Sequence, residues 1–294
     1  MKKILAYVMM GLCAAGSAAV AAPVQGSAEV QATALMQMER DARCGQVIVT
    51  AYVGGTPLKM MLDTGATHTV LHEESAARLQ KVQWIDTSKM KFRGNSAQNI
   101  KMLVAPLLAG PGESPQHPMM VLNLAAVRSM MAVKIDGIIG MDFLGSMPFT
   151  FDFKTNEFYW GLPSGGKVAP IPVEAEPTGR VHVVAQCGGK QLKLLLDTGS
   201  TVTRVRQEDW APGVAGEIQA QIGDVDTAIH QQMVEGKPGD MELAPGVVLR
   251  GVKPLLCGPN ELTMLGLDAL KDSVLIHVPV ETVPGGVFLM KSDK

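Results

Sequence analysis

Leu62-Asp63-Thr64-Gly65-Ala66-Thr67 and Leu196-Asp197-Thr198-Gly199-Ser200-Thr201 are two copies of one short motif, and they lie 134 residues apart. When residues 45–67 are aligned with residues 179–201 without a gap, 13 of the 23 positions are identical. A chain that repeats a carboxylate in the same local frame can bring both copies together across a pseudo-twofold axis. Two carboxyls in one site acquire different pKa values, as an acid–base pair requires.

A second shared element follows each motif, at residues 136–144 and 262–270. Each contains two apolar residues, a glycine, and then the start of a predicted short helix with an aspartate in its first turn. The apolar residues and glycines are Ile138, Ile139 and Gly140 in the first copy and Met264, Leu265 and Gly266 in the second. We interpret Asp142 and Asp268 as helix-start residues, stabilised by local amides and the helix dipole, rather than as catalytic groups.

The N-terminal residues have the pattern of a secretory signal peptide. Lys2 and Lys3 precede an uncharged stretch at residues 4–20, and small residues follow. We predict cleavage after Ala21 or Ala22. A retained membrane anchor is the alternative, but the stretch is shorter than the roughly 20 residues that a span needs. The expected location is the bacterial periplasm or the exterior, without a stable membrane span in the mature form.

Composition limits the classes of molecule that the protein is expected to bind. A net charge of −2 and the lack of a basic run argue against nucleic acid. After Cys13 the chain has Cys44, Cys187 and Cys257, so at most one intramolecular disulfide can form; we favour Cys187–Cys257, although the spacing does not fix the pairing. No cofactor and no metal are predicted, because the spacing of His68 and His72 in a predicted strand does not suit a shared ligand.

Two domains are predicted from the remaining length. Alternating apolar residues or short apolar runs predict strands at residues 46–53, 58–62, 149–153, 158–160, 274–278 and 287–290. Glycines and prolines crowd residues 161–180 and indicate a linker. The expected organisation is a signal peptide (1–21), a leader (22–43), an N-terminal lobe (44–160), a linker (161–179) and a C-terminal lobe (180–292). The leader could be an inhibitory propeptide, a strand or a flexible segment, and residues 32–43 have helical spacing.

The duplicated Asp-Thr-Gly-(Ala/Ser)-Thr motif, with its downstream apolar-apolar-Gly element, resembles the retropepsin and pepsin superfamily of aspartic proteases. Retroviral members pair two single-lobe chains, whereas pepsin-like members hold both lobes in one chain. This chain resembles the second arrangement with lobes of retropepsin size, and it is similar in outline to bacterial periplasmic retropepsin-like proteins. The resemblance implies a mainly β, two-lobed acid-protease fold, with two pseudo-symmetric β-barrel lobes and short helices. It also implies a monomer with intramolecular lobe pairing.

Asp63 and Asp197 are therefore the candidate catalytic residues of an aspartic endopeptidase that acts on polypeptides. Two carboxyls a few ångströms apart cannot both ionise at low cost, so they share a proton. One carboxylate then polarises a water molecule, while the other, as the acid, hydrogen-bonds the scissile carbonyl. The motif does not determine which of the two carboxyls is protonated.

The resemblance assigns supporting roles around this pair. It implies that Thr64 and Thr198 bond to the backbone of the opposite lobe, and that Gly65 and Gly199 allow close approach and unusual dihedral angles. The apolar pairs would pack beneath the aspartate loops, with Gly140 and Gly266 letting the chains cross closely. Ser200 can donate a hydrogen bond to its neighbouring carboxylate and Ala66 cannot, so we expect a pH optimum shifted upward from strongly acidic pH.

Family members close the cleft with a β-hairpin flap. Arg93, Gly94 and Asn95 have the turn chemistry for its tip, and residues 222–225 are a poorer candidate in the second half. Neither segment has the tyrosine that pepsin-like flaps carry. Trp84 and Trp210 are assigned to packing, with cleft lining as the alternative.

Two rival interpretations stay open. The first is a catalytically inert module of the same fold that binds peptides or glycans. The second is pairing of one lobe with the same lobe of another chain. Because both Asp-Thr-Gly copies are complete, catalysis within one chain is favoured over either rival.

Overall fold

Each copy of the repeat folds into a β-hairpin whose second strand ends at the motif aspartate. In the first copy, β4 (Val47–Val53) and β5 (Thr56–Leu62) pair in antiparallel around Gly54 and Gly55. Their φ values of 56° and 82° lie in the left-handed region that glycine adopts at low cost. In the second copy, β15 (Val181–Cys187) and β16 (Lys190–Leu196) repeat this geometry.

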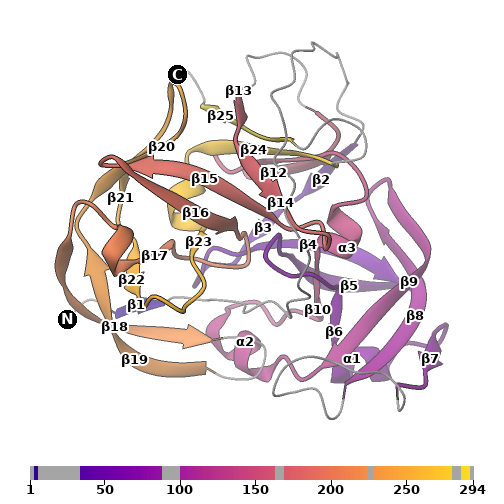
Figure 1. Cartoon of the computed structure of the whole chain (residues 1–294). Helices are drawn as coiled ribbons and strands as arrows, with labels where there is room; N and C mark the ends of the chain where they lie inside the picture. The colour runs from indigo at the N-terminus through magenta and orange to yellow at the C-terminus, as the bar shows by residue number, and fades with distance from the viewer. Residues whose placement is uncertain are drawn as a thin grey trace.

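The computed structural model describes residues 3–5, 34–87, 100–162, 169–223, 228–279 and 286–291. Two lobes lie side by side, the first on the right of Figure 1 and the second on the left, with a third sheet across the top. The predicted class, a mainly β two-lobed acid-protease fold, is confirmed. Within the described ranges, no helix is long and apolar enough to cross a membrane.

The first lobe is a closed barrel. Its ring of six strands runs β4-β5-β10-β6-β9-β8 and closes because β4 pairs with both β5 and β8. Besides β4 and β5, the ring consists of β6 (Val70–His72), β8 (Lys101–Ala109), β9 (Gly112–Leu122) and β10 (Gly137–Ile139). The short strands β3 (Glu39–Arg40) and β7 (Gln83–Ile85) lie outside the ring. Its helices are α1 (Glu73–Ala77), α2 (Ala125–Met130) and α3 (Met141–Leu144).

The second lobe is a more open sheet with the same central order. β15 and β16 lie within it, and β1 (Lys3–Leu5), from the predicted signal segment, pairs with β18 at one edge. The other elements are β14 (Val173–Ala175), β17 (Arg204–Arg206), a 3₁₀ turn (Gln207–Asp209), β18 (Val214–Gly223), β19 (Ala228–Gly236), β20 (Gly239–Ala244), β21 (Val247–Val252), β22 (Leu255–Cys257), β23 (Met264–Leu265) and α4 (Leu267–Leu270).

Both lobes thread a short strand between the two strands that flank the motif. β10 is parallel to β5 and antiparallel to β6, while β23 is parallel to β16 and antiparallel to β17. The centre of each lobe therefore has the same topology. This places both Asp-Thr-Gly loops on equivalent strand ends that face each other.

A six-stranded base sheet joins the lobes. β11 (Phe149–Asp152) of the first half pairs in antiparallel with β24 (Ser273–Val278) of the second. The remaining strands are β2 (Ala34–Gln37), β12 (Glu157–Trp160), β13 (Ala169–Ile171) and β25 (Gly286–Lys291). The Phe149 ring stacks on His277 across the lobe boundary, with centroids 4.7 Å apart. Aromatic burial at this joint fixes the lobes to each other.

Three features of the structure bear on the sequence expectations. The leader contributes β2 and β3, so in these segments it forms strands, one of the alternatives left open, and not the helix that its spacing suggested. The glycine- and proline-rich linker contains β13 and β14. The favoured Cys187–Cys257 disulfide is wrong, because Cys44, Cys187 and Cys257 are all free thiols.

Candidate active site

Asp63 and Asp197 meet at the seam between the lobes. Both side chains are completely buried, at 0 % exposure. The Asp63 amide donates to the carbonyl of Ile139 (3.0 Å), and the Asp197 amide donates to the carbonyl of Leu265 (3.0 Å). The threaded strands β10 and β23 thus anchor the two loops, and the carboxyls lie within hydrogen-bonding distance of each other.

One oxygen of each carboxyl is held by its own loop. Asp63 Oδ1 accepts hydrogen bonds from the amides of Gly65 (2.8 Å) and Ala66 (3.0 Å). Asp197 Oδ1 accepts from the amide of Ser200 (3.0 Å), and its carboxyl also accepts from the amide of Gly199. Among the described residues, neither Oδ2 atom accepts a hydrogen bond from any donor outside the pair. Buried oxygens without a protein donor are uncommon, and a catalytic role is one of their explanations.

Burial and proximity shift the ionisation of both carboxyls. Desolvation raises the pKa of Asp63 to about 6, against the hydrogen bonds from its loop amides. Desolvation also raises the pKa of Asp197 well above its ordinary value, and the negative charge of Asp63 raises it further. The pair therefore keeps one proton over a range in which exposed carboxyls are ionised.

Thr64 and Thr198 brace the two loops through a reciprocal set of hydrogen bonds. Thr64 Oγ1 donates to the carbonyl of Leu196 (2.8 Å) and accepts from the amide of Thr198 (3.0 Å). Thr198 Oγ1 donates to the carbonyl of Leu62 (3.0 Å) and accepts from the amide of Thr64 (3.0 Å). All four bonds are buried and cross between the lobes, so the distance between the carboxyls is fixed by both loops at once.

The motif glycines make room for the opposite carboxyl. A methyl group on Gly65 would lie 2.5 Å from Cγ of Asp197, and one on Gly199 would overlap the carboxyl of Asp63. Neither glycine has a positive φ, so the expectation of unusual dihedral angles is wrong and only the close approach is needed. Gly140 and Gly266 lie against the backbone of residues 66–68 and of Val202, where the chains cross.

The apolar pairs lie beneath the loops. Ile138, Ile139, Met264 and Leu265 are completely buried. Directly after them, the amide of Met141 donates to the carbonyl of Ala66 (2.9 Å), and the amide of Leu267 donates to the carbonyl of Ser200 (2.9 Å). The start of α3 and the start of α4 therefore hold the outer ends of the two loops.

Comparison with known proteins agrees with this geometry. Residues 49–143 match the model of a family described as aspartyl protease. This segment of the chain is therefore similar to aspartyl proteases. The match includes Asp63 and the Ile138-Ile139-Gly140 element, whereas the second lobe is related to it by the internal repeat. A search of curated proteins finds no match to the chain.

In both lobes a threonine binds the helix-start aspartate, a contact that sequence reasoning missed. Thr69 donates through its amide (2.9 Å) and hydroxyl (2.8 Å) to Asp142, and the Thr203 hydroxyl donates to Asp268 (2.7 Å). The sequence contained a sign of this contact, because a threonine lies six residues after the motif aspartate in both copies. Asp142 and Asp268 thus tie the segment after each motif to the helix that follows β10 or β23.

Ser200 does not differentiate the two carboxyls in the expected way. Its hydroxyl donates to the carbonyl of Val202 (2.8 Å) and not to Asp197. Ser200 therefore acts on its own loop backbone, and the expected effect of the Ala66/Ser200 difference on the carboxyl pKa is wrong. The upward pKa shift that we expected has burial as its main cause instead.

Two further buried side chains cross the seam, and neither was singled out in the sequence. Gln46 Nε2 donates to the carbonyl of Gly199, and Arg180 Nη1 donates to the carbonyl of Gly65 (3.3 Å). Both residues occupy the same position of the repeat, one residue after its first glycine.

The flap candidates and the two tryptophans singled out in the sequence are not part of the aspartate pair's surroundings as described above. Arg93, Gly94 and Asn95 lie outside the described residues, in the connection between the antiparallel strands β7 and β8. Trp210 is buried and donates to the carbonyl of Lys237 (2.9 Å), so packing explains it. Trp84 is 49 % exposed on the edge strand β7.

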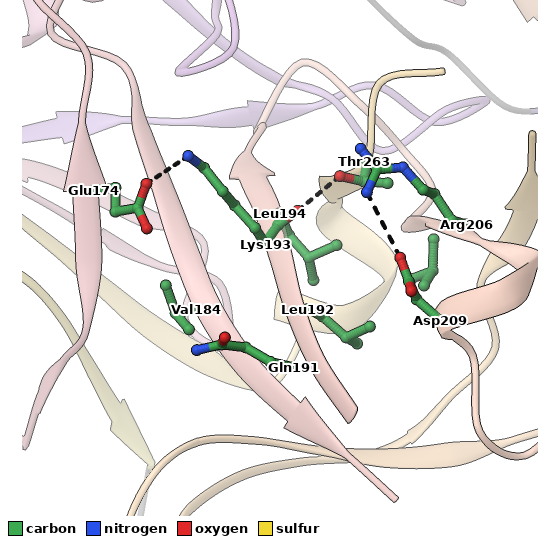
Figure 2. A pocket seen from close by; sticks show the side chains of 10 residues that line it. Glu174, Val184, Gln191, Leu192, Lys193, Leu194, Arg206, Asp209 and Thr263 are labelled. Atoms are coloured by element: carbon green, nitrogen blue, oxygen red, sulfur yellow. Dashed lines mark hydrogen bonds and ion pairs between the residues drawn. The ribbon is translucent and has the colours of Figure 1, made fainter. Parts of the chain in front are cut away.

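The pocket in Figure 2 lies on β14, β16 and β17 of the second lobe and does not include either aspartate. It has a volume of about 280 Å³. Lys193 faces Glu174 at 2.5 Å, and Arg206 faces Asp209 at 3.7 Å. Since both cations already face carboxylates, this pocket does not compete with the buried dyad as the candidate active site.

Proposed function

We propose that the chain is an exported aspartic endopeptidase that hydrolyses peptide bonds with a water molecule activated between Asp63 and Asp197. The observation that carries this proposal is the pair of buried carboxyls, which interact with each other and each have one oxygen held by loop amides. A merely structural Asp-Thr-Gly turn would not need a second carboxyl at the same point. The family match of the first lobe supports the same chemistry.

The arrangement provides both an acid and a base without a metal ion. The carboxylate removes a proton from water as the water oxygen bonds to the scissile carbonyl carbon. The carboxylic acid gives its proton to the carbonyl oxygen, which produces a neutral tetrahedral diol. When the C–N bond breaks, the nitrogen takes the proton that came from water, and one diol hydroxyl returns a proton to the other carboxyl. The dyad is thereby restored, and water has been added across the amide.

Polypeptide is the proposed substrate, and the periplasm or the exterior of a bacterial cell the proposed location. Cell fractionation and N-terminal sequencing of the mature protein would test export and the cleavage site after Ala21 or Ala22. We also propose that both lobes of one chain form the site, with lobe boundaries at residues 44–160 and 180–292. Sedimentation of the active protein as a monomer is the expected result.

An inert peptide- or glycan-binding module is the second candidate function. The complete set of Thr64 and Thr198 bonds argues against it, because a binding cleft does not require the carboxyls to be braced at one distance. This reasoning makes catalysis the stronger candidate.

The deciding experiment uses purified mature protein with unfolded casein and a peptide library between pH 3 and pH 8. We expect cleavage by the wild type and by Glu113→Gln, which removes an exposed carboxyl on β9. Asp63→Asn and Asp197→Asn should each lose cleavage. A wild type that cuts nothing, or aspartate variants that cut as well as the wild type, would leave the binding module as the better assignment.

A further inference from the structure

Arg180 and Gln46 are a matched pair in which only one member is charged. Both are buried, and the Arg180 side chain is only 2 % exposed. Each donates across the seam to the carbonyl of the opposite motif glycine, Arg180 to Gly65 and Gln46 to Gly199. The two halves of the site are therefore alike in hydrogen bonding at this pair of positions, but the residue that bonds to the Asp63 loop is a cation and the one that bonds to the Asp197 loop is neutral.

The guanidinium is fixed in orientation by its other partners. Nε and Nη2 of Arg180 donate to Glu176 Oε2 at 2.9 and 2.7 Å, which leaves Nη1 directed to the carbonyl of Gly65. Glu176 Oε1 lies 2.7 Å from His182 Nε2, and Thr178 donates to Oε2. Burial works against ionisation of Glu176, but hydrogen bonds from His182 and Arg180 hold its pKa below the ordinary value. The cation is therefore kept ionised and in place.

The remaining groups around the dyad do not supply a comparable asymmetry. Each carboxyl accepts hydrogen bonds from two amides of its own loop. The positive charge of Arg180 opposes the upward shift in the pKa of Asp63, whereas the charge of Asp63 adds to the upward shift at Asp197. The other charged or titratable groups on the packed elements include His68, His117, Asp142, Arg204 and Asp268.

Those other groups are engaged elsewhere. Asp142 is bound by Thr69 and lies 3.3 Å from His117 Nε2, and Asp268 is bound by Thr203. The buried Arg204 on β17 donates to Glu261. His68 is exposed and contacts the Thr67 hydroxyl. Arg180 is thus the charged group that distinguishes the two carboxyls.

We propose that Arg180 breaks the symmetry of the dyad and holds the shared proton on Asp197, so that Asp63 is the carboxylate that activates water. Arg180 is a positioning residue, since it acts on the reacting atoms through the Gly65 loop. Asp197 then gives its proton to the carbonyl oxygen of the substrate, and Asp63 accepts the proton from water. These roles rest on the proposed peptidase function, whereas the position of the proton does not.

Carbon-13 NMR of the labelled aspartate carboxyls, titrated from pH 3 to pH 8, tests the position directly. Asp63→Asn and Asp197→Asn assign the two signals. In the wild type, Asp63 should titrate at lower pH than Asp197. Arg180→Gln keeps a side-chain N–H for Gly65, as Gln46 provides for Gly199, but removes the charge. We expect it to raise the Asp63 midpoint by about one pH unit, at the low end of the effect of a nearby opposite charge.

Two further variants separate charge from structure. Arg180→Lys should preserve the wild-type order of titration, and the exchange Gln46→Arg with Arg180→Gln should reverse it. If Arg180→Gln leaves Glu176 uncompensated and fails to fold, Arg180→Gln with Glu176→Gln removes both charges together. Equal midpoints in the wild type, or the same order in the exchange variant, would overturn the proposal.

Peptide cleavage is measured in an assay separate from the NMR titration. If the protein cleaves peptides, the acidic limb of kcat/KM in Arg180→Gln should move upward with the Asp63 midpoint. If it cleaves nothing while the NMR order changes as expected, the peptidase assignment fails and the proton assignment stands. An acidic limb that does not move in an active Arg180→Gln variant would overturn the assignment of the base.

Discussion

Burying two carboxyls at the lobe seam should make the protein less stable as the pH rises, and this can be measured without any substrate. The perturbation is the double variant Asp63→Asn/Asp197→Asn, which keeps the size of the side chains and removes both ionisable groups. Asp63 and Asp197 are completely buried, and the pKa of Asp63 is raised from 3.8 to about 6. The unfolded chain releases these protons near pH 4, while the folded chain retains at least one of them.

Proton linkage determines whether the free energy of unfolding rises or falls with pH. A folded-state pKa above the unfolded value gives a stabilising contribution that is full below about pH 4 and is lost as the pH rises through about 6. A rise from 3.8 to about 6 at 1.36 kcal/mol per pH unit corresponds to about 3 kcal/mol from Asp63 alone. The upward shift at Asp197 adds to it. Relative to the wild type, the double variant should therefore gain at least about 3 kcal/mol between pH 4 and pH 7.

Urea denaturation followed by tryptophan fluorescence, at half-unit steps from pH 3.5 to pH 7.5, gives the two stability curves. Glu113→Gln is the matched control, because an exposed carboxyl should leave the wild-type pH dependence unchanged. The difference between wild type and double variant is the informative quantity, since it cancels every other titrating group. A difference that stays constant with pH would refute the reasoning that the dyad is buried and holds a proton in the folded state.

Three further outcomes are expected. Thr64→Val removes the bonds to Leu196 and Thr198 and leaves two buried backbone groups unpaired, so the free energy of unfolding should fall by about 2–4 kcal/mol in urea titrations, with Thr64→Ser recovering most of it. Gly65→Ala pushes a methyl group against the Asp197 carboxyl and should lower peptide cleavage at least about 10²-fold, while Gly216→Ala, which has open space, should not. The raised pKa values of both carboxyls place the alkaline limb of kcat/KM above about pH 6; a profile that peaks below about pH 3 would contradict this.

The parts of the fold with local signals were predictable from the sequence. The alternation in residues 47–53 and the glycine pairs at the turns identify both hairpins, and the repeated aspartate indicates where they meet. The short helices α3 and α4 begin where the apolar-apolar-Gly elements end. In these segments, the local pattern and the tertiary structure agree.

Other features depend on partners that are distant in the chain. β2 forms by pairing with β12, more than a hundred residues later, and that pairing outweighs the helical spacing of the leader. The sequence offers the Ser200 hydroxyl two acceptors, the Asp197 carboxylate and a nearby backbone carbonyl, and only the folded loop selects the carbonyl of Val202. In the alignment of the two copies, the difference between Gln46 and Arg180 looks like any other mismatch. Its role becomes clear only when the carbonyls of Gly199 and Gly65, which come from the opposite lobe, are known to accept their hydrogen bonds.

The shared base sheet has an evolutionary consequence. Because the two halves belong to one polypeptide and are joined through β11 and β24, both half-sites stay together at any dilution, and a change in one half is not copied into the other. An assembly of two identical chains must show every substitution twice and stay symmetric until a ligand binds. Covalent fusion removes that restriction, so a single inherited exchange such as glutamine for arginine can give the two halves separate duties.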